Sequence, residues 1–153
     1  MSKWLVKSEP DVYSIDDLQT DKTTCWDNVR NYEARNNLQR FAVGDLILYY
    51  HSNAEPSGIA GICKVAKAAY PDPSQFDRKS EYFDPKATIA APRWFSPELR
   101  FVAKFPRLIE LSELRTNSHC QAMILLKRGS RLSVQPVSEK EFATIIKIAG
   151  AKL

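Results

Sequence analysis

Residues 26–36 carry the side chains of this sequence that are best suited to binding a flat, polar ligand. Within eleven positions they supply two aromatic rings, two guanidinium groups and three amides, on Trp26, Tyr32, Arg30, Arg35, Asn28, Asn31 and Asn36. Rings stack on bases, amides pair with base edges, and guanidinium groups contact phosphates. This combination is typical of a nucleobase pocket. The alternative is a helix whose rings enter the core and whose arginines pair with acids.

A second group of polar, planar side chains follows an apolar run. Residues 46–50 are aliphatic or aromatic, which predicts a strand buried on both faces, and Tyr50, His51 and Ser52 stand at its end. Such groups suit the mouth of a pocket. His51 could equally be a buried imidazole that hydrogen-bonds to the backbone. An enzyme that uses His51 as an acid or base is a further alternative, although His51 and Ser52 would point to opposite faces of a strand.

Residues 131–137 predict a last short strand with one polar face. Arg131, Ser133 and Gln135 alternate with apolar residues, so they share that face. The face could line a groove or could simply be exposed to solvent. Trp94 is a third candidate for stacking on a ligand, and its alternative role is that of a core anchor.

The elements that must position these groups are short strands with short helices between them. The apolar patterns predict strands over residues 3–7, 46–50, 59–69, 99–105 and 131–137, with Pro106 ending the fourth. Helices are predicted to start at Ser14 and Ser118 and to cover residues 29–41 and 138–150. This order favours an α+β fold, a single domain over residues 1–153, built on a curved sheet or small β-barrel flanked by short helices.

Composition excludes several classes of protein. With 153 residues, 44% of them hydrophobic, the chain has the length of one domain and can form a core. No run approaches the ~18 apolar residues of a membrane span. The start of the chain lacks a secretory signal, and the widely spaced Cys25, Cys63 and Cys120 fit reduced thiols. We expect a cytoplasmic location and a monomer.

Charge is distributed unevenly along the chain. The net charge is +4, yet residues 1–76 carry an acidic excess, whereas residues 77–153 carry a clear excess of Lys and Arg. A basic half of a compact domain could face phosphates, or it could be a solvated surface.

Motifs for the common cofactors and metals are missing from the sequence. The five glycines are too scattered for a dinucleotide-binding or phosphate-binding loop, and no C-x-x-C or H-x-x-x-H pair is present. We therefore expect neither a cofactor nor a metal, and we favour a binding protein over an enzyme.

Several motifs, in order along nearly the whole chain, resemble the EVE domain family of the PUA-like superfamily. They are Lys7-Ser8-Glu9-Pro10, residues 26–36, Tyr50-His51-Ser52-Asn53, Gly58-Ile59-Ala60-Gly61-Ile62, Pro71-Asp72-Pro73, Trp94 and residues 130–137. The resemblance implies a PUA-like β-barrel flanked by helices, with a concave, aromatic-lined pocket. It also implies a link to modified bases, since eukaryotic EVE proteins are associated with modified cytosines in DNA.

The resemblance further implies roles for individual residues. Trp26 and Trp94 match wall or stacking positions. Residues that match positions reading the base edge are Ser8, Asn31, His51, Ser52 and Ser133, and those that match phosphate or carboxylate contacts are Arg30, Arg35 and Arg131. The candidate ligand-binding set is completed by Asn28, Val29, Tyr32, Tyr50 and Gln135.

Two positions depart from the family pattern. The family often has Gly where this chain has Asn28, and Asn tolerates the left-handed backbone better than most residues, so the turn can form. The family often has Gln at the position of Glu33, whose carboxylate lacks amide donors and repels phosphate. We expect either that Glu33 faces away from nucleic acid or that the ligand preference differs.

These observations predict a non-enzymatic module that binds a modified nucleobase of DNA or RNA, flipped out of a duplex or in a single strand. Trp26 should line a cavity whose opening is flanked by His51 and Arg131. The alternatives are a nucleobase-modifying enzyme that uses His51, and a small-molecule or protein-interaction module.

Overall fold

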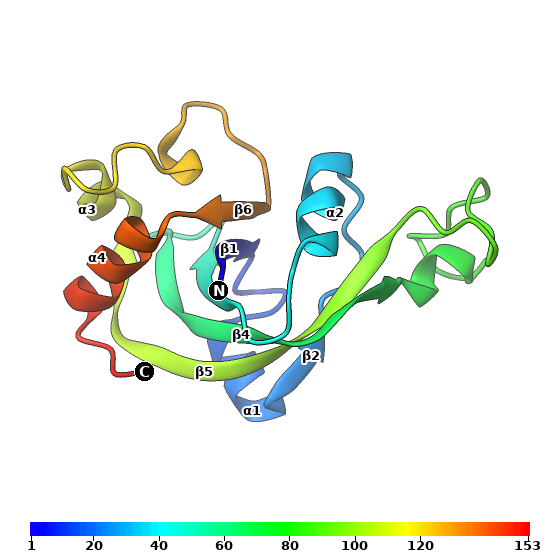
Figure 1. The fold of residues 1–153 in the computed structure, drawn as a ribbon, viewed down its shortest axis with the longest axis horizontal. Helices are drawn as coiled ribbons and strands as arrows, with labels where there is room; N and C mark the ends of the chain where they lie inside the picture. Colours follow the sequence, from blue (N-terminus) through cyan, green and yellow to red (C-terminus); the bar gives the residue numbers. More distant parts are fainter.

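Six strands form one mixed β-sheet in the computed structural model, which describes residues 1–153 (Figure 1). The strands are β1 (Lys3–Ser8), β2 (Thr23–Cys25), β3 (Leu46–His51), β4 (Gly58–Pro71), β5 (Phe95–Glu110) and β6 (Val134–Val137). Their order is β2-β5-β4-β3-β1-β6, with β1 and β3 parallel and all other neighbours antiparallel. The helices are α1 (Ile15–Asp21), α2 (Tyr32–Gln39), α3 (Leu111–Arg115) and α4 (Glu139–Ala149), with 3-10 turns at Pro73–Phe76 and Ile124–Leu126.

The sheet curves strongly but stays open (Figure 1). β2 and β6 lie at its two ends and do not pair with each other. Helix α2 contacts both β6 and β5, so a helix stands where closure would require another strand pairing. The predicted α+β class and flanking helices are confirmed, whereas the closed β-barrel implied by the family resemblance is wrong. None of the helices has the length and apolar character that a membrane crossing requires.

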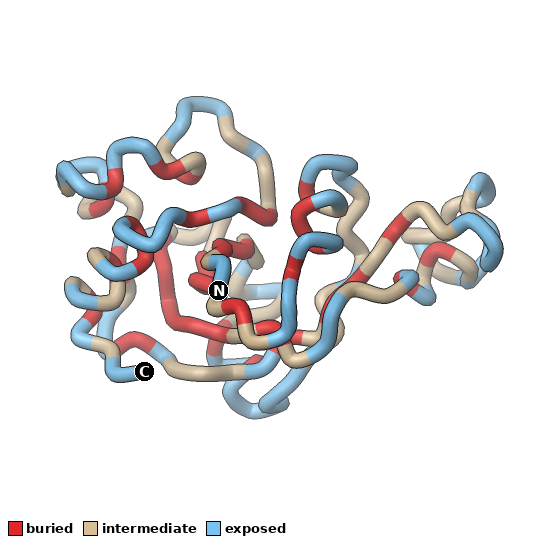
Figure 2. The backbone as a smooth tube through the Cα atoms, in the orientation of Figure 1, coloured by how far each residue is buried: buried red, intermediate tan, exposed pale blue.

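The central strands are buried on both faces, as the apolar run at residues 46–50 predicts. In β1, Leu5 packs on one side of the sheet and Trp4 and Val6 pack on the other, because successive side chains of a strand alternate. The Leu5 side is covered by α3 and α4, and the opposite side by α1 and α2. Figure 2 shows the resulting concentration of buried residues along the middle of the sheet. These two apolar layers hold the strand ends in place.

Strand β5 is longer than the sequence pattern predicts. The prediction that Pro106 ends a strand over residues 99–105 is wrong, since β5 continues to Glu110. The ladder between β4 and β5 is irregular between Lys104 and Ile109, so Pro106 lies where no paired N–H is needed. A proline at an irregularity is therefore compatible with the strand.

Strands β4 and β5 also approach each other closely at two glycines. A Cβ atom on Gly58 would lie 2.5 Å from the carbonyl oxygen of Ile109, and one on Gly61 would meet the carbonyl oxygen of Ala103. Any larger residue at either position would push the two strands apart.

Two elements differ from those predicted from the sequence. Strand β2 was not among the predicted strands, and it pairs with β5. The helix predicted over residues 29–41 is α2, which begins at Tyr32 because the Asn31 side chain accepts the N–H of Ala34 and caps the helix. Residues 26–31 are consequently a loop rather than part of a helix.

The C-terminal helix is confirmed, whereas the helix predicted to start at Ser118 is reduced to a 3-10 turn at Ile124–Leu126. In α4, Ser138 and Glu141 form the predicted reciprocal capping box, and Gly150 adopts the left-handed conformation at the end.

Beyond the sheet, β4 and β5 continue into an arm, residues 72–94, which projects to the right in Figure 1. Gln75 is buried inside it. Its Nε2 donates to the carbonyl oxygens of Asp72 and Trp94, both at 2.8 Å, and its Oε1 accepts the N–H groups of Arg93 and Trp94. Since every hydrogen-bonding site of this amide is used, the arm has a defined internal frame.

Candidate functional site

A cavity of about 350 Å³ opens between the end of β1, strand β2 and the loop that follows β2. Five of the predicted ligand-binding residues line it: Ser8, Trp26, Asn28, Val29 and Ser133. The residues that complete the lining were not among the predicted ones: Lys7, Val12, Tyr13, Thr24, Cys25, Asp27 and Tyr82. The volume falls in the range of about 300–1,000 Å³ that is usual for small-molecule sites.

Trp26 forms one wall of this cavity and is only partly buried. Its backbone N–H donates to the carbonyl oxygen of Pro97 in β5 at 2.8 Å, which extends the β2 pairing by one residue. Its ring meets the buried Tyr49 ring edge-on, with centroids 5.7 Å apart and planes at 80°. The indole is thus held by the core on one side while it lines the cavity on another.

The floor of the cavity is fixed by one carbonyl group. The carbonyl oxygen of Tyr13 accepts hydrogen bonds from the hydroxyls of Ser8 and Tyr49, both at 2.7 Å. The Ser8 hydroxyl therefore uses its hydrogen in a bond to the backbone and offers its oxygen as an acceptor. Burial is the main reason why the pKa of Tyr49 lies well above its usual value, so this phenol stays neutral.

A turn at Asn28 shapes the opposite wall. Asn28 has a φ of +65°. This is the left-handed conformation expected at a position where the family often has glycine. The backbone N–H of Asn28 donates to Oδ2 of Asp72 at 2.8 Å, and its Oδ1 lies 2.9 Å from the Ser74 hydroxyl oxygen. The turn is therefore attached to the arm, more than forty residues away in the chain.

Asp72 is the centre of this attachment, and its side chain is completely buried. Its carboxylate accepts bonds from the N–H groups of Asn28 and Ser74, from the Ser74 hydroxyl, and from Arg30 at 3.1 Å. Burial by itself raises the pKa of Asp72, but these hydrogen bonds outweigh it and leave the pKa below its usual value. The carboxylate therefore stays ionised.

Arg30, predicted to contact phosphate, instead connects the loop of residues 26–31 to the arm. Its guanidinium donates to the carbonyl oxygen of Tyr82 through Nε and Nη2, and it also bonds to Asp72, Ser74 and the carbonyl oxygen of Val29. Each of its three nitrogens thus has a partner within the protein. These bonds place Tyr82 at the rim of the cavity.

Trp94, Tyr32 and Arg35 form a separate stack outside the cavity. The rings of Trp94 and Tyr32 lie 5.0 Å apart at 25°, and the Arg35 guanidinium lies 4.9 Å from the Tyr32 ring and 5.8 Å from that of Trp94. Trp94 is 6% exposed, and its indole N–H donates to Asp84 at 2.8 Å. Trp94 therefore takes its alternative role of an anchor, here between α2 and the arm.

His51 also lies outside the cavity lining. Its Nε2 accepts the N–H of Ile15 at 3.1 Å, which satisfies one of the free amides at the start of α1. Desolvation is the main cause of a pKa below the usual value, with Lys104 adding to it and Asp16 opposing it. The alternative of an imidazole bonded to backbone is thus the one found, although His51 is half-buried rather than buried, and the lone pair of Nε2 is used in this bond.

This contact predicts a pH-dependent contribution of His51 to stability. Protonation would remove the acceptor, so the contribution is present above the unfolded pKa of about 6.5 and is lost as the pH falls through the folded value. Wild-type protein should lose about 1 kcal/mol relative to His51→Gln between pH 7.5 and pH 5, because a glutamine oxygen accepts the same N–H without titrating. Urea unfolding of both proteins at each pH measures this, and parallel pH profiles would contradict it.

The remaining candidates lie in neighbouring depressions or in the interior. Tyr50 and Ser52 line a second hollow, and Asn31 and Arg131 line a third. The prediction that residues 131, 133 and 135 share a strand face is wrong, because β6 begins only at Val134. Gln135 is 1% exposed and donates to the carbonyl oxygen of Leu132. His51 and Arg131 consequently do not flank the opening, although the cavity beside Trp26 exists.

Two lining residues matter for electrostatics and were missed. Lys7 lies at the end of β1, where burial lowers the pKa of its ammonium group, and its Nζ donates to the carbonyl oxygen of Ser130 at 3.4 Å. Asp27 follows Trp26, and burial followed by the charge of Asp72 raises the pKa of its carboxyl group. Lys7 is next to Ser8 and Asp27 is next to Trp26 in the sequence, so their positions beside predicted site residues could have identified them. Tyr82 had no such signal, since only the arm brings it close.

The chain is similar to known proteins along its whole length. The sequence model of the EVE domain matches residues 2–148. Human thymocyte nuclear protein 1 is 39% identical over 166 aligned residues, which cover 96% of this chain and 73% of that protein. A hypothetical protein from Leishmania major has 46% identity and a TM-score of 0.92, over 98% of this chain and 95% of its own. Human THYN1, solved in complex with DNA containing 5-methylcytosine, has 37% identity and a TM-score of 0.90 over 100% of both chains. The chain therefore belongs to the EVE domain family.

Proposed function

We propose that this protein is a non-enzymatic reader that takes one modified cytosine of a nucleic acid into the cavity beside Trp26. The observation that carries the proposal is a cavity of about 350 Å³, large enough for a base and lined by a partly exposed indole, in a fold shared with a protein crystallised in complex with 5-methylcytosine DNA. A base in a duplex cannot reach such a cavity, so it enters flipped out or from a single strand.

Stacking supplies affinity in this proposal and hydrogen bonding supplies identity. A base stacked on Trp26 gains about 1–3 kcal/mol. The aliphatic side chains of Val12 and Val29 also line the cavity, and Val12 is 73% exposed, which leaves it free to pack against a methyl group. Polar groups on Ser8, Asp27 and Asn28 are available to the base edge. An unmatched buried polar group costs about 1–3 kcal/mol, which penalises the wrong base.

Asp27 is the group in the cavity whose chemistry favours cytosine. A carboxylate accepts a hydrogen bond from the exocyclic amine of cytosine, whereas thymine presents an oxygen at the same place and is repelled. Since the pKa of Asp27 is raised, this preference is present at neutral pH and weakens as the pH falls towards the folded value.

Replacing Asp27→Asn should reduce the preference for 5-methylcytosine over thymine by about 1–3 kcal/mol. The amide is the same size and presents either an oxygen or an NH₂ group, so it tolerates both bases. Fluorescence anisotropy with single-stranded oligonucleotides that differ at one base measures the ratio of the two dissociation constants. An unchanged ratio would exclude Asp27 from base reading.

The function itself is tested by binding wild-type protein to a panel of oligonucleotides. The panel contains cytosine, 5-methylcytosine, thymine and other modified bases, each in DNA and RNA and each in single-stranded and duplex form. Preference for a modified base supports the proposal, and equal affinity for all members contradicts it. Long incubation followed by mass spectrometry separates a reader, which leaves the base intact, from an enzyme.

A further inference from the structure

A second hollow, of about 470 Å³, adjoins the cavity and is strongly basic. Four cationic side chains line it, on Lys7, Arg115, Lys127 and Arg128. No acidic residue lines it, and none of the four takes part in an ion pair with an acidic side chain. Clustered like charges repel one another, so such an arrangement is stabilised when an anion lies between them.

The basic hollow and the cavity share one side chain. Lys7 lines both, and its bond to the carbonyl oxygen of Ser130 attaches it to the loop between Ile124–Leu126 and β6. The same loop sends Ser130 into the basic hollow and Ser133 into the cavity. An extended chain of three residues spans at most about 10 Å, so a ligand in one hollow reaches the other within a short distance.

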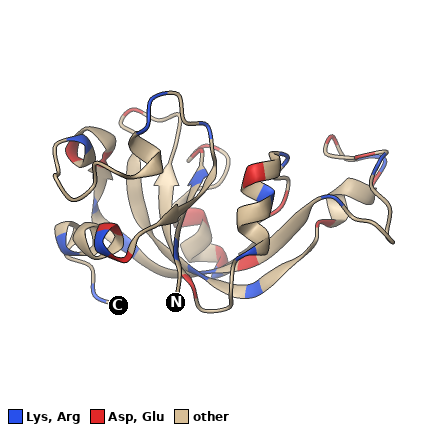
Figure 3. Ribbon diagram, turned by 45° about the horizontal axis from the view of Figure 1, so that its top comes forward, with Lys and Arg blue, Asp and Glu red and all other residues tan.

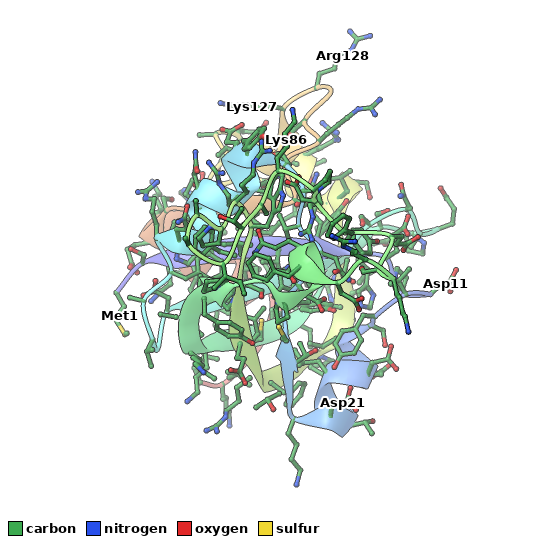
Figure 4. All side chains as sticks on the ribbon, turned by 90° about the vertical axis from the view of Figure 1, so that its right-hand side faces the viewer. Met1, Asp11, Asp21, Lys86, Lys127 and Arg128 are labelled. Carbon is green, nitrogen blue, oxygen red and sulfur yellow. The ribbon has the colours of Figure 1, made fainter.

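The most basic part of the hollow is also its most exposed part. Figure 3 shows Lys and Arg at the tip of the loop before β6, and in Figure 4 Lys127 and Arg128 project from one end of the molecule while Asp21 lies towards the opposite end. The side chains of Lys127 and Arg128 donate no hydrogen bond within the protein. Both are consequently free to contact a ligand.

We propose that this basic hollow binds the sugar-phosphate backbone of the strand whose base occupies the cavity. The inference rests on the proposed function and adds a second site to it. Hydroxyl and amide groups on Ser52, Asn53 and Ser57 stand among the cations, and such groups commonly contact phosphate oxygens. The continuity with the cavity through Lys7 favours a polynucleotide over an acidic peptide or a membrane surface.

The test compares Lys127→Ala/Arg128→Ala with Lys140→Ala/Lys147→Ala, a matched variant that removes two exposed lysines from α4. Each protein is titrated with single-stranded DNA carrying one 5-methylcytosine, and with its unmethylated equivalent, at five salt concentrations. For the first variant, the slope of log K against log salt should become shallower by about 1.4, since each phosphate contact to a single strand contributes about 0.7. Affinity for both oligonucleotides should fall by the same factor, and the matched variant should behave as wild type.

Each outcome separates the two proposals. If the first variant keeps the wild-type slope and affinity, the basic hollow is not the backbone site, whereas a persisting preference for methylcytosine leaves the reader intact. If wild type shows no base preference but the first variant still loses slope, the backbone site stands and the reader is wrong. Stronger binding of wild type to anionic vesicles or to polyglutamate than to the oligonucleotide would overturn the backbone site. Thermal melts by circular dichroism check that both variants are folded.

Discussion

Trp26→Ala should remove most of the binding of methylcytosine-containing single-stranded DNA while the protein stays folded. The substitution removes the stacking surface. The expected loss of binding free energy is about 1–3 kcal/mol, which corresponds to a roughly 5- to 150-fold larger dissociation constant. Trp26 is partly exposed and lies at the edge of the sheet, so its removal opens the cavity without emptying the core. Fluorescence anisotropy measures binding, and circular dichroism reports the fold.

Trp26→Phe is the matched control, because a phenyl ring keeps a stacking face and the edge contact with Tyr49. It should retain most of the affinity and all of the preference for methylcytosine. The opposite result, in which Trp26→Ala binds and discriminates like wild type, would mean that the base lies elsewhere and that the cavity serves another ligand.

Asp72→Ala should cause the largest loss of stability among the substitutions considered, about 2–4 kcal/mol. Removing one partner of a buried ion pair typically costs about 3–5 kcal/mol, and the lower range applies because the Arg30 side chain keeps 21% exposure to solvent. The substitution also strands the N–H groups of Asn28 and Ser74. Urea unfolding measures the loss, and binding should weaken in parallel because Asn28 and Tyr82 both depend on this attachment.

Asp72→Asn separates charge from shape, since the amide keeps an acceptor oxygen and the size of the side chain. Its loss of stability should be smaller than that of Asp72→Ala and should depend on pH. The lowered pKa of Asp72 means that the advantage of wild type is present above pH 3.8 and is lost as the pH falls through the folded value. A loss below about 0.5 kcal/mol for Asp72→Ala, the usual range for surface sites, would show that the arm does not depend on this carboxylate.

Prediction from sequence succeeded where the signal is local. The left-handed turn at Asn28 was expected from the glycine that the EVE family often has at this position. The capping box of Ser138 and Glu141 and the apolar stripe of α4 each depend on residues within about one or two helical turns of each other. Such features need no knowledge of what lies opposite in the fold.

Prediction failed where the partner is distant in the chain. Pro106 would end an isolated strand, but it falls in an irregular stretch of the ladder between β4 and β5. Arg30 has the chemistry of a phosphate contact, yet its partners lie more than forty residues away in the arm. His51 resembles a catalytic or base-reading group, yet its partner is the first amide of α1.

The amino-acid sequence alone determined the family, the α+β class, the two ends of α4 and the segment that supplies the indole of the cavity. Tertiary structure alone decided which side chains line the cavity and which are engaged elsewhere: Ser8, Asp27 and Lys7 line the cavity, whereas Arg30, His51 and Trp94 make their bonds outside it. The physical reason is that the type of a residue determines which hydrogen bonds and contacts its side chain can make. Only the folded chain states which of those bonds are already made, because each donor and acceptor buried in the protein must find its partner there.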